Sequence, residues 1–221
     1  MNVINNILFL LRIEIFKNSQ MKIIKILMFL SLTFVTNVSF SQNIFQNESI
    51  GFSIQQPEKW IKAKEGQTID NLKSNIKLDE KIVAKLLEQN KGTIQVVTYF
   101  KYPIETTAGI IPTIKVNLRS NPHKNFVDFR KSIEESFIGI KKVFTDFKYI
   151  SAPTESIVDG KKCITATCIY TLTGKGGNEK VKIIVYAIPV RNQFYQVTLM
   201  DTEDGSNTEL FQKIVNTIVI K

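Results

Sequence analysis

The chain has 221 residues, of which 43% are hydrophobic and 22% charged, with a mean hydropathy of -0.01. This composition is ordinary for a globular protein and excludes both a disordered chain and a polytopic membrane protein. The formal net charge of +9 comes mostly from scattered lysines, since the arginines are only Arg12, Arg119, Arg130 and Arg191. Proteins that bind nucleic acids cluster arginine with exposed aromatic residues, so we expect no nucleic-acid partner.

Residues 21–41 have the three parts of a secretory signal peptide. Lysines follow Met21, residues 26–38 are uncharged and largely apolar, and small residues precede a cleavage site before Gln42. The apolar stretch is shorter than the roughly 20 residues of a transmembrane helix. We therefore expect a periplasmic or secreted protein without a membrane span after processing.

Residues 1–20 do not fit this signal, because their apolar stretch carries Arg12 and Glu14. We interpret them as an extension upstream of a true start at Met21, and the alternative is an uncleaved N-terminal anchor. No cysteine lies near the cleavage site, so a lipid anchor is not indicated. Residues 42–221 are expected to form a single domain.

Periodic apolar residues predict the elements of this domain in chain order. In its first half, strands are expected at 49–55, 93–101 and 114–119, and a helix at 79–89. Trp60 is expected to fill the core beside the first strand. In the strand at 114–119, polar residues alternate with apolar ones, which predicts one buried and one solvent-facing side.

The second half predicts an amphipathic helix at 126–138, followed by hairpins and a final helix. Asp159-Gly160 is a strong hairpin turn, and the glycine-rich residues 174–178 form a second hairpin tip. Ser206 and Glu209 have the spacing of a capping box at the last helix. Hairpin-linked strands and about three covering helices define an α+β fold, arranged as an α/β/α sandwich with a central antiparallel sheet.

Three patterns could carry chemistry, and each has a simpler interpretation. His123 is the only histidine, so a serine or cysteine hydrolase would have to use it, but it lies in a loop where an exposed residue is expected. The glycines at 174–177 lack the spacing of a phosphate-binding loop. Asp201, Glu203 and Asp204 suggest a calcium loop, but Gly205 stands at the wrong position for one.

Cys163 and Cys168 are the only cysteines and fall five residues apart in one predicted strand. Successive side chains of a strand point to opposite faces, so these two cannot form a disulfide bond with each other. Cys168 shares its face with apolar residues and is expected in the core. Cys163 shares its face with threonines and is expected to be the more accessible thiol.

Several short motifs follow one another in a characteristic order. Residues 51–54 (Gly-Phe-Ser-Ile) precede Pro57-x-x-Trp60, a strand at 111–116 follows, and Asp159-Gly160 precedes a long hairpin and a terminal helix. This order resembles that of the PsbP-like superfamily. The resemblance covers most of residues 45–221. It implies an α/β/α sandwich and a non-enzymatic role in binding proteins, as an assembly factor or chaperone. Matched positions are structural, so no functional residue is carried over.

We therefore expect an exported, non-enzymatic protein-binding module with an unknown protein partner. We assign no catalytic, cofactor-binding or metal-binding residue, and no cofactor. The alternatives are a secreted hydrolase working through His123, and a lysine-rich protein that makes weak contact with membrane surfaces or polyanions.

Overall fold

The computed structural model describes residues 43–64, 67, 92–107, 109–174 and 177–221, all of which belong to the compact unit Asn43–Lys221. Three predictions lie outside these residues and stay predictions: the extension at 1–20, the signal peptide at 21–41 and the helix at 79–89.

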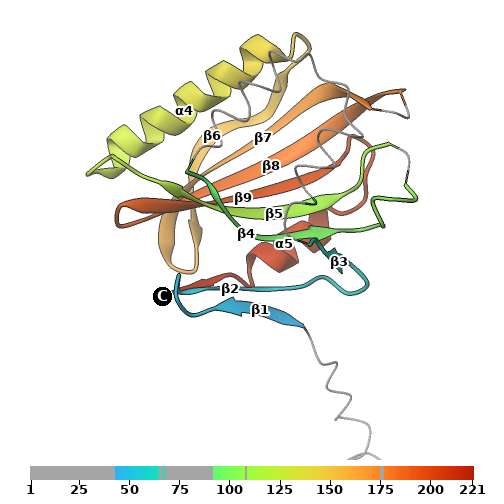
Figure 1. Ribbon diagram of the computed structural model, residues 1–221. Coiled ribbons are helices and arrows are strands. Elements are labelled where there is room, and N and C mark those ends of the chain that lie inside the picture. The colour runs from blue at the N-terminus through green and yellow to red at the C-terminus, as the bar shows by residue number, and fades with distance from the viewer. Residues whose placement is uncertain (1–42, 65–66, 68–91, 108, 175–176) are drawn as a thin grey trace, which may run out of the picture. The chain divides into compact units, whose positions relative to one another are not determined.

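Antiparallel sheets make up most of the described residues (Figure 1). A three-stranded sheet has the order β1-β2-β10, and a seven-stranded sheet has the order β3-β4-β5-β9-β8-β7-β6. The strands are β1 (Ile44–Asn47), β2 (Phe52–Gln55), β3 (Ile61–Lys62), β4 (Ile94–Phe100), β5 (Thr113–Ser120), β6 (Lys148–Val158), β7 (Lys161–Gly174), β8 (Gly177–Val190), β9 (Gln193–Thr202) and β10 (Val219–Ile220). The described helices are α4 (Phe126–Val143) and α5 (Thr208–Val215).

These elements confirm the predicted α+β fold class. A sandwich with about three helices is not established, because the third predicted helix lies outside the described residues. The short strands β1 and β10 were not predicted, since four and two residues are too few for a periodic pattern to stand out.

The predicted hairpin turns are confirmed. Asp159 and Gly160 join β6 to β7 with φ values of 48° and 68°, the positive values that a tight two-residue turn requires. Gly174 pairs with Gly177 across the tip of the β7–β8 hairpin. The glycine-rich run therefore lies between two strands and precedes no helix.

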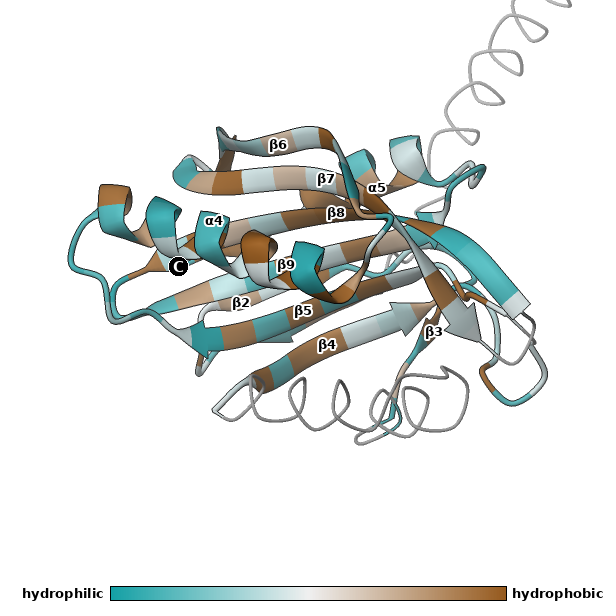
Figure 2. Cartoon of the chain, turned by 90° about the horizontal axis from the view of Figure 1, so that it is seen from above, coloured by the Kyte–Doolittle hydropathy of each residue, from teal (hydrophilic) through white to brown (hydrophobic). Residues whose placement is uncertain are grey.

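Helix α4 begins where the sequence predicts. The side chain of Asn125 accepts a hydrogen bond from the backbone N–H of Asp128 at 2.9 Å, which caps the helix. The helix continues five residues beyond the predicted end, because Ile140 adds a turn to the apolar stripe that packs on the sheet. Figure 2 shows the alternation of polar and apolar residues along α4.

The predicted capping box of α5 is wrong. The N-cap residue is Asn207 rather than Ser206, and its side chain makes no capping hydrogen bond. The Asn207 amide instead donates to Asp201 Oδ2 at 2.9 Å and accepts from Lys101 Nζ at 3.0 Å. The Asn207 side chain is therefore held by hydrogen bonds to Asp201 and Lys101 and does not cap α5.

Each face of the seven-stranded sheet has its own hydrophobic core. One core contains the buried residues of α5 and β2 and lies against β5, β8 and β9. Trp60 belongs to it, is 5% exposed and packs edge-on against Phe211, as predicted. The other core contains the buried residues of α4 and lies against β7 and β8.

The two cysteines occupy these two cores. Cys163 lies in the core that contains α5, and Cys168 in the core that contains α4, so the prediction of opposite faces is confirmed. The prediction that Cys163 is accessible is wrong, since its exposed fraction is 0%. Val158 and Tyr186 belong to the same core as Cys163, which the threonines beside it in sequence did not reveal.

We expect neither thiol of the folded protein to react with dithiobis(nitrobenzoate). Burial raises the pKa of Cys163 and Cys168 to about 11 and keeps the thiols from solvent. Both should react once the protein is unfolded in guanidinium chloride. Rapid reaction of one thiol in the folded protein would contradict its burial.

The raised pKa values also make stability depend on pH. Because burial raises the pKa of both thiols above 9.0, the stability that depends on neutral thiols is present below about pH 9 and falls as the pH rises through about 11.

Candidate functional site

The face of the seven-stranded sheet beneath α4 has an apolar half and a polar half. In the register of the sheet, Lys115 pairs with Thr198, and Thr198 in turn pairs with Val185. Residues paired in this way point to the same face of the sheet. The apolar residues on this face of β8 and the polar residues on this face of β5 therefore belong to one surface. We name its polar half the polar strip, which consists of Thr98, Lys115, Asn117, Arg119, Gln196 and Thr198.

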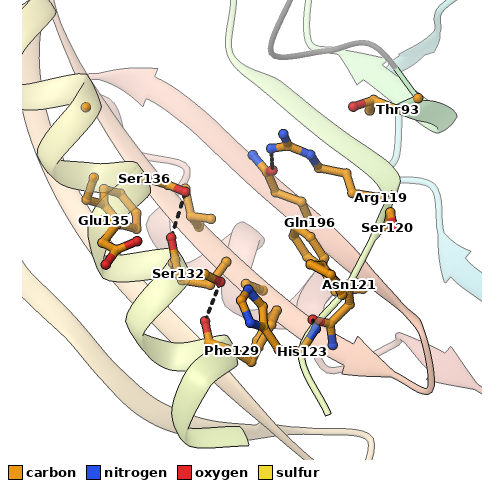
Figure 3. Close-up of a pocket in the computed structure, with 18 of the residues that line it drawn as sticks. Thr93, Arg119, Ser120, Asn121, His123, Phe129, Ser132, Glu135, Ser136 and Gln196 are labelled. Atoms are coloured by element: carbon orange, nitrogen blue, oxygen red, sulfur yellow. Dashed lines mark hydrogen bonds between the residues drawn. The ribbon is translucent and has the colours of Figure 1, made fainter. Parts of the chain in front are cut away.

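A cleft of about 580 Å³ lies between α4 and the end of β5, with β8 and β9 beneath it (Figure 3). Phe129, Ile133 and Phe194 contribute apolar surface to it. This volume is in the range of sites that hold small molecules or short segments of a partner. The cleft is therefore the candidate functional site of the described residues.

Part of the α4 wall of the cleft consists of small side chains whose polar groups are already satisfied. The Ser132 hydroxyl donates to the Phe129 carbonyl at 2.7 Å, and the Ser136 hydroxyl donates to the Ser132 carbonyl at 2.9 Å (Figure 3). Gly139 follows on the same wall. Since these groups need no further partner, apolar surface can approach this side of the helix at little cost.

The opposite wall is polar. Arg119 Nη1 donates to Gln196 Oε1 at 2.9 Å, and the guanidinium group lies 5.7 Å from the centre of the Phe194 ring. Burial lowers the pKa of Arg119. Beside it, the Asn121 side chain accepts a hydrogen bond from the backbone N–H of His123 at 3.2 Å, which shapes the loop at the mouth of the cleft.

The polar strip is more buried than its sequence predicts. Asn117 is 6% exposed and Thr98 is 1% exposed, whereas alternation along β5 predicted a solvent-facing side. Among the described residues, Asn117 Oδ1 and Thr98 Oγ1 have no hydrogen-bond partner. Lys115 lies between them, makes no ion pair with any described acid, and has its pKa lowered by burial. Such groups carry a desolvation cost that a bound partner could relieve.

Gly139 stands in the interior of α4, where glycine is an unfavourable residue. A Cβ atom added to Gly139 would meet no atom of a neighbouring element within 4 Å. Packing therefore does not require glycine at this position. What glycine provides is open space on the cleft wall and close access to the helix backbone.

We expect Gly139→Ala to raise the free energy of unfolding by about 0.5–1 kcal/mol, because alanine favours the helix and the added methyl group meets no obstacle. Urea denaturation followed by circular dichroism measures this. Gly160→Ala is the matched control, since its Cβ also meets open space but its φ of 68° is strained for alanine. It should lower stability. A destabilised Gly139→Ala variant would mean that the space is not open.

His123 lies on the loop before α4 and lines the cleft, and it is half-buried rather than fully exposed. Ser132 and Ser136 line the cleft with it, but both hydroxyls donate to carbonyl groups of their own helix. A serine nucleophile would instead donate to the histidine that activates it. The described residues therefore bring His123 and two serines into one cleft without the hydrogen bonds of a triad.

The acidic loop at 201–205 has a structural role. Asp201 is 1% exposed, and its carboxylate accepts hydrogen bonds from Thr202 N, Asn207 N and Asn207 Nδ2. This carboxylate ties the end of β9 to the start of α5. In the part of the chain that the structure describes, no three acids, histidines or cysteines lie close enough to hold a metal ion.

We expect Gly205→Ala to destabilise the protein by about 2–3 kcal/mol. A Cβ atom on Gly205 would overlap the Asp201 carboxyl group, which would have to leave its buried hydrogen bonds. Thermal unfolding measures the loss. Ser206→Ala is the control, since Ser206 is exposed and does not cap α5, so its effect should stay within about 0.5 kcal/mol. Equal effects of the two substitutions would contradict this account.

Comparison with solved structures identifies the fold. Cyanobacterial PsbP (CyanoP) from Synechocystis sp. PCC 6803 matches with a TM-score of 0.51 and 12% identity, over 84% of this chain and 96% of that chain. The chain has a PsbP-like fold. This confirms the resemblance inferred from the sequence motifs.

Two further structures are less similar. A protein from Bacteroides thetaiotaomicron matches with a TM-score of 0.47 and 10% identity, over 82% of this chain and 49% of that chain. LpqN of Mycobacterium tuberculosis, which is involved in cell envelope biogenesis, matches with a TM-score of 0.42 and 10% identity, over 83% of this chain and 87% of that chain. Both similarities are too low to support a conclusion about this chain. No protein-family model and no curated protein sequence matches it.

The cleft was not predicted from the sequence. Two signals were present in the sequence. Ser132, Ser136 and Gly139 recur at helical spacing along one side of an amphipathic helix, and Lys115 and Arg119 alternate with apolar residues on one strand. None of the described helices is long and apolar enough to cross a membrane.

Proposed function

We propose that the chain is an exported, non-enzymatic binding module that holds a segment of a partner protein in the cleft beside α4. The observation that carries this proposal is the construction of the cleft, in which apolar residues and the small residues Ser132, Ser136 and Gly139 of α4 lie opposite half-buried polar groups of β5 and β9. Such a pair of walls fits a segment with an apolar side and a polar side. An assembly factor or a chaperone would use the cleft in this way.

The compartment in the proposal rests on the sequence. Residues 21–41 have the composition of a signal peptide, and its removal would release residues 42–221 as a single domain in the periplasm or outside the cell. Two buried cysteines in separate cores suit an oxidising compartment, because neither thiol is available for exchange.

The hydrolase alternative has less support from the cleft. Its two serines are engaged with backbone carbonyls, and no described acid makes a hydrogen bond to the His123 ring, whose backbone N–H donates to Asn121. Binding needs only the shape and polarity that the walls have, so the cleft supports binding better than acyl transfer.

Filling the cleft should abolish partner binding without unfolding the protein. Gly139→Leu places a side chain in the open space on the α4 wall, while Lys131→Leu adds the same side chain at an exposed position of the same helix. The tagged wild-type domain and both variants are used to capture partners from an envelope extract of the source cells. The captured protein is then purified, and its affinity is measured by calorimetry. We expect at least a tenfold loss for Gly139→Leu and little change for Lys131→Leu.

Hydrogen exchange on the purified complex locates the contact. Binding through the cleft should slow exchange at 119–123 and at the residues of α4 that line it, such as Ser132, Ser136 and Gly139. A partner that binds Gly139→Leu as tightly as wild type would rule out the cleft as its site. Turnover of ester or peptide substrates that is lost in His123→Ala would favour the hydrolase instead.

A further inference from the structure

We propose that the end of α4 and the start of β6 form a surface that attaches the protein to an anionic phospholipid bilayer. This surface, which we name the α4–β6 patch, combines exposed apolar side chains with exposed lysines and consists of Ile138, Lys141, Lys142, Lys148, Tyr149 and Ile150. None of these residues lines the cleft, so attachment leaves the cleft open to a partner segment.

The apolar side chains of the patch are exposed to solvent. Ile138 is 53% exposed, whereas its neighbour Phe137 is buried against the sheet. Ile150 is 57% exposed and has no pairing partner on β7, because the register of β6 shifts between Tyr149 and Ser151. Packing within the domain therefore accounts for neither isoleucine, and a surface outside the chain would remove both from water.

Aromatic contacts hold the two elements side by side, so that these side chains belong to one surface. The ring of Tyr149 lies 5.9 Å from the ring of Phe137 on α4 and 4.9 Å from the ring of Phe147, which is buried. The short connection between the end of α4 and the start of β6 is visible in Figure 1. Tyr149 therefore fixes the start of β6 against the last turns of the helix. A contiguous group of exposed apolar side chains is typical of an interaction surface.

The lysines of the patch surround its apolar side chains. Lys141 and Lys142 follow Ile138 by three and four residues, the spacing that places side chains next to each other on a helix. Lys148 directly precedes Tyr149 on β6. All three lysines are exposed, and none makes an ion pair with a described residue. Their charges are therefore available to an anionic surface.

Acids near the patch do not cancel these charges. Between residues 136 and 154 the chain has three lysines and a single acid, Asp146. The Asp146 carboxylate accepts hydrogen bonds from the backbone N–H and the hydroxyl of Thr171 on β7. One turn before the patch, Glu134 is paired with Arg130 at 2.8 Å. The patch therefore has a net positive charge, which complements an anionic partner.

A bilayer suits this arrangement because a fluid surface surrounds separate side chains without needing a pocket for each. Ile138 stands on the convex side of a helix and Ile150 on the edge strand of the sheet. Apolar side chains of this kind enter the head-group region, while the long stems of lysines bring their ammonium groups to the lipid phosphates. Tyrosine favours the same depth, since its ring is apolar and its hydroxyl polar. A soluble polyanion would use the lysines only.

Sedimentation with lipid vesicles tests the inference. The protein is purified in the form that accumulates in cells expressing the whole chain, so that all variants share one N-terminus. It is mixed with vesicles of phosphatidylcholine, or of equimolar phosphatidylcholine and phosphatidylglycerol. We expect at least about tenfold stronger partitioning onto the anionic vesicles, and this preference should decline as NaCl is added.

Matched charge variants locate the surface. The patch variant combines Lys141→Gln, Lys142→Gln and Lys148→Gln. The control variant removes the same charge from exposed lysines elsewhere and combines Lys64→Gln, Lys213→Gln and Lys221→Gln. Partitioning onto the anionic vesicles should weaken at least about tenfold in the patch variant and less than about threefold in the control. If the patch variant does not fold by circular dichroism, the Lys141→Gln, Lys142→Gln double variant replaces it.

An apolar variant distinguishes a bilayer from a soluble polyanion. Ile138→Gln leaves the charge unchanged and should weaken partitioning about fivefold, because the side chain no longer enters the bilayer. Ile44→Gln is the control at an exposed isoleucine of β1 and should partition as the wild type does. Retention of Ile138→Gln on immobilised heparin should not change.

Equal partitioning onto the two kinds of vesicle, or equal losses in the patch and control variants, would overturn the inference. Wild-type partitioning of Ile138→Gln, together with a loss of heparin retention in the patch variant, would assign the lysines to a soluble polyanion and overturn it as well. Capture of a partner through the cleft is a separate measurement, so the proposed function stands or fails independently.

Discussion

A strand that is buried on both faces has no solvent in which to place its polar side chains, and this constraint governs the structure around β5. One side of β5 contributes Ile114, Val116 and Leu118 to the core that contains α5. The other side carries Lys115 and Asn117, which are half-buried and buried although they are polar. Every polar atom there needs a partner within the protein or a ligand, and Asn117 Oδ1 has none among the described residues.

The position of α4 follows from the same constraint. The helix packs its apolar stripe over β7 and β8, where the sheet is apolar, and leaves the polar strip beside it. The cleft is the space between this helix and the end of β5. Its α4 wall has Gly139 at a position where alanine would stabilise the helix, and open space lies over this residue. The helix thus serves both as cover for the core and as one wall of the site.

Two patterns that resemble functional motifs are instead parts of the framework. The acids at 201–204 include Asp201, whose buried carboxylate holds the start of α5, and Gly174 pairs with Gly177 at the end of the β7–β8 hairpin. Similarity to a cyanobacterial PsbP shows the same fold at 12% identity, but a fold does not specify a function. The function therefore depends on the side chains of the cleft.

The sequence by itself determined the fold class, the helix at Asn125, the turn at Asp159-Gly160 and the opposite faces of the two cysteines, because these depend on neighbours along the chain. Only the tertiary structure decided that Cys163 is buried, that Asn207 binds Asp201 instead of capping α5, and that the polar side of β5 borders a cleft. Those outcomes depend on which elements pack on each face of the sheet. Periodicity predicts which residues of a strand share a face, but long-range packing decides which of the two faces is exposed to solvent.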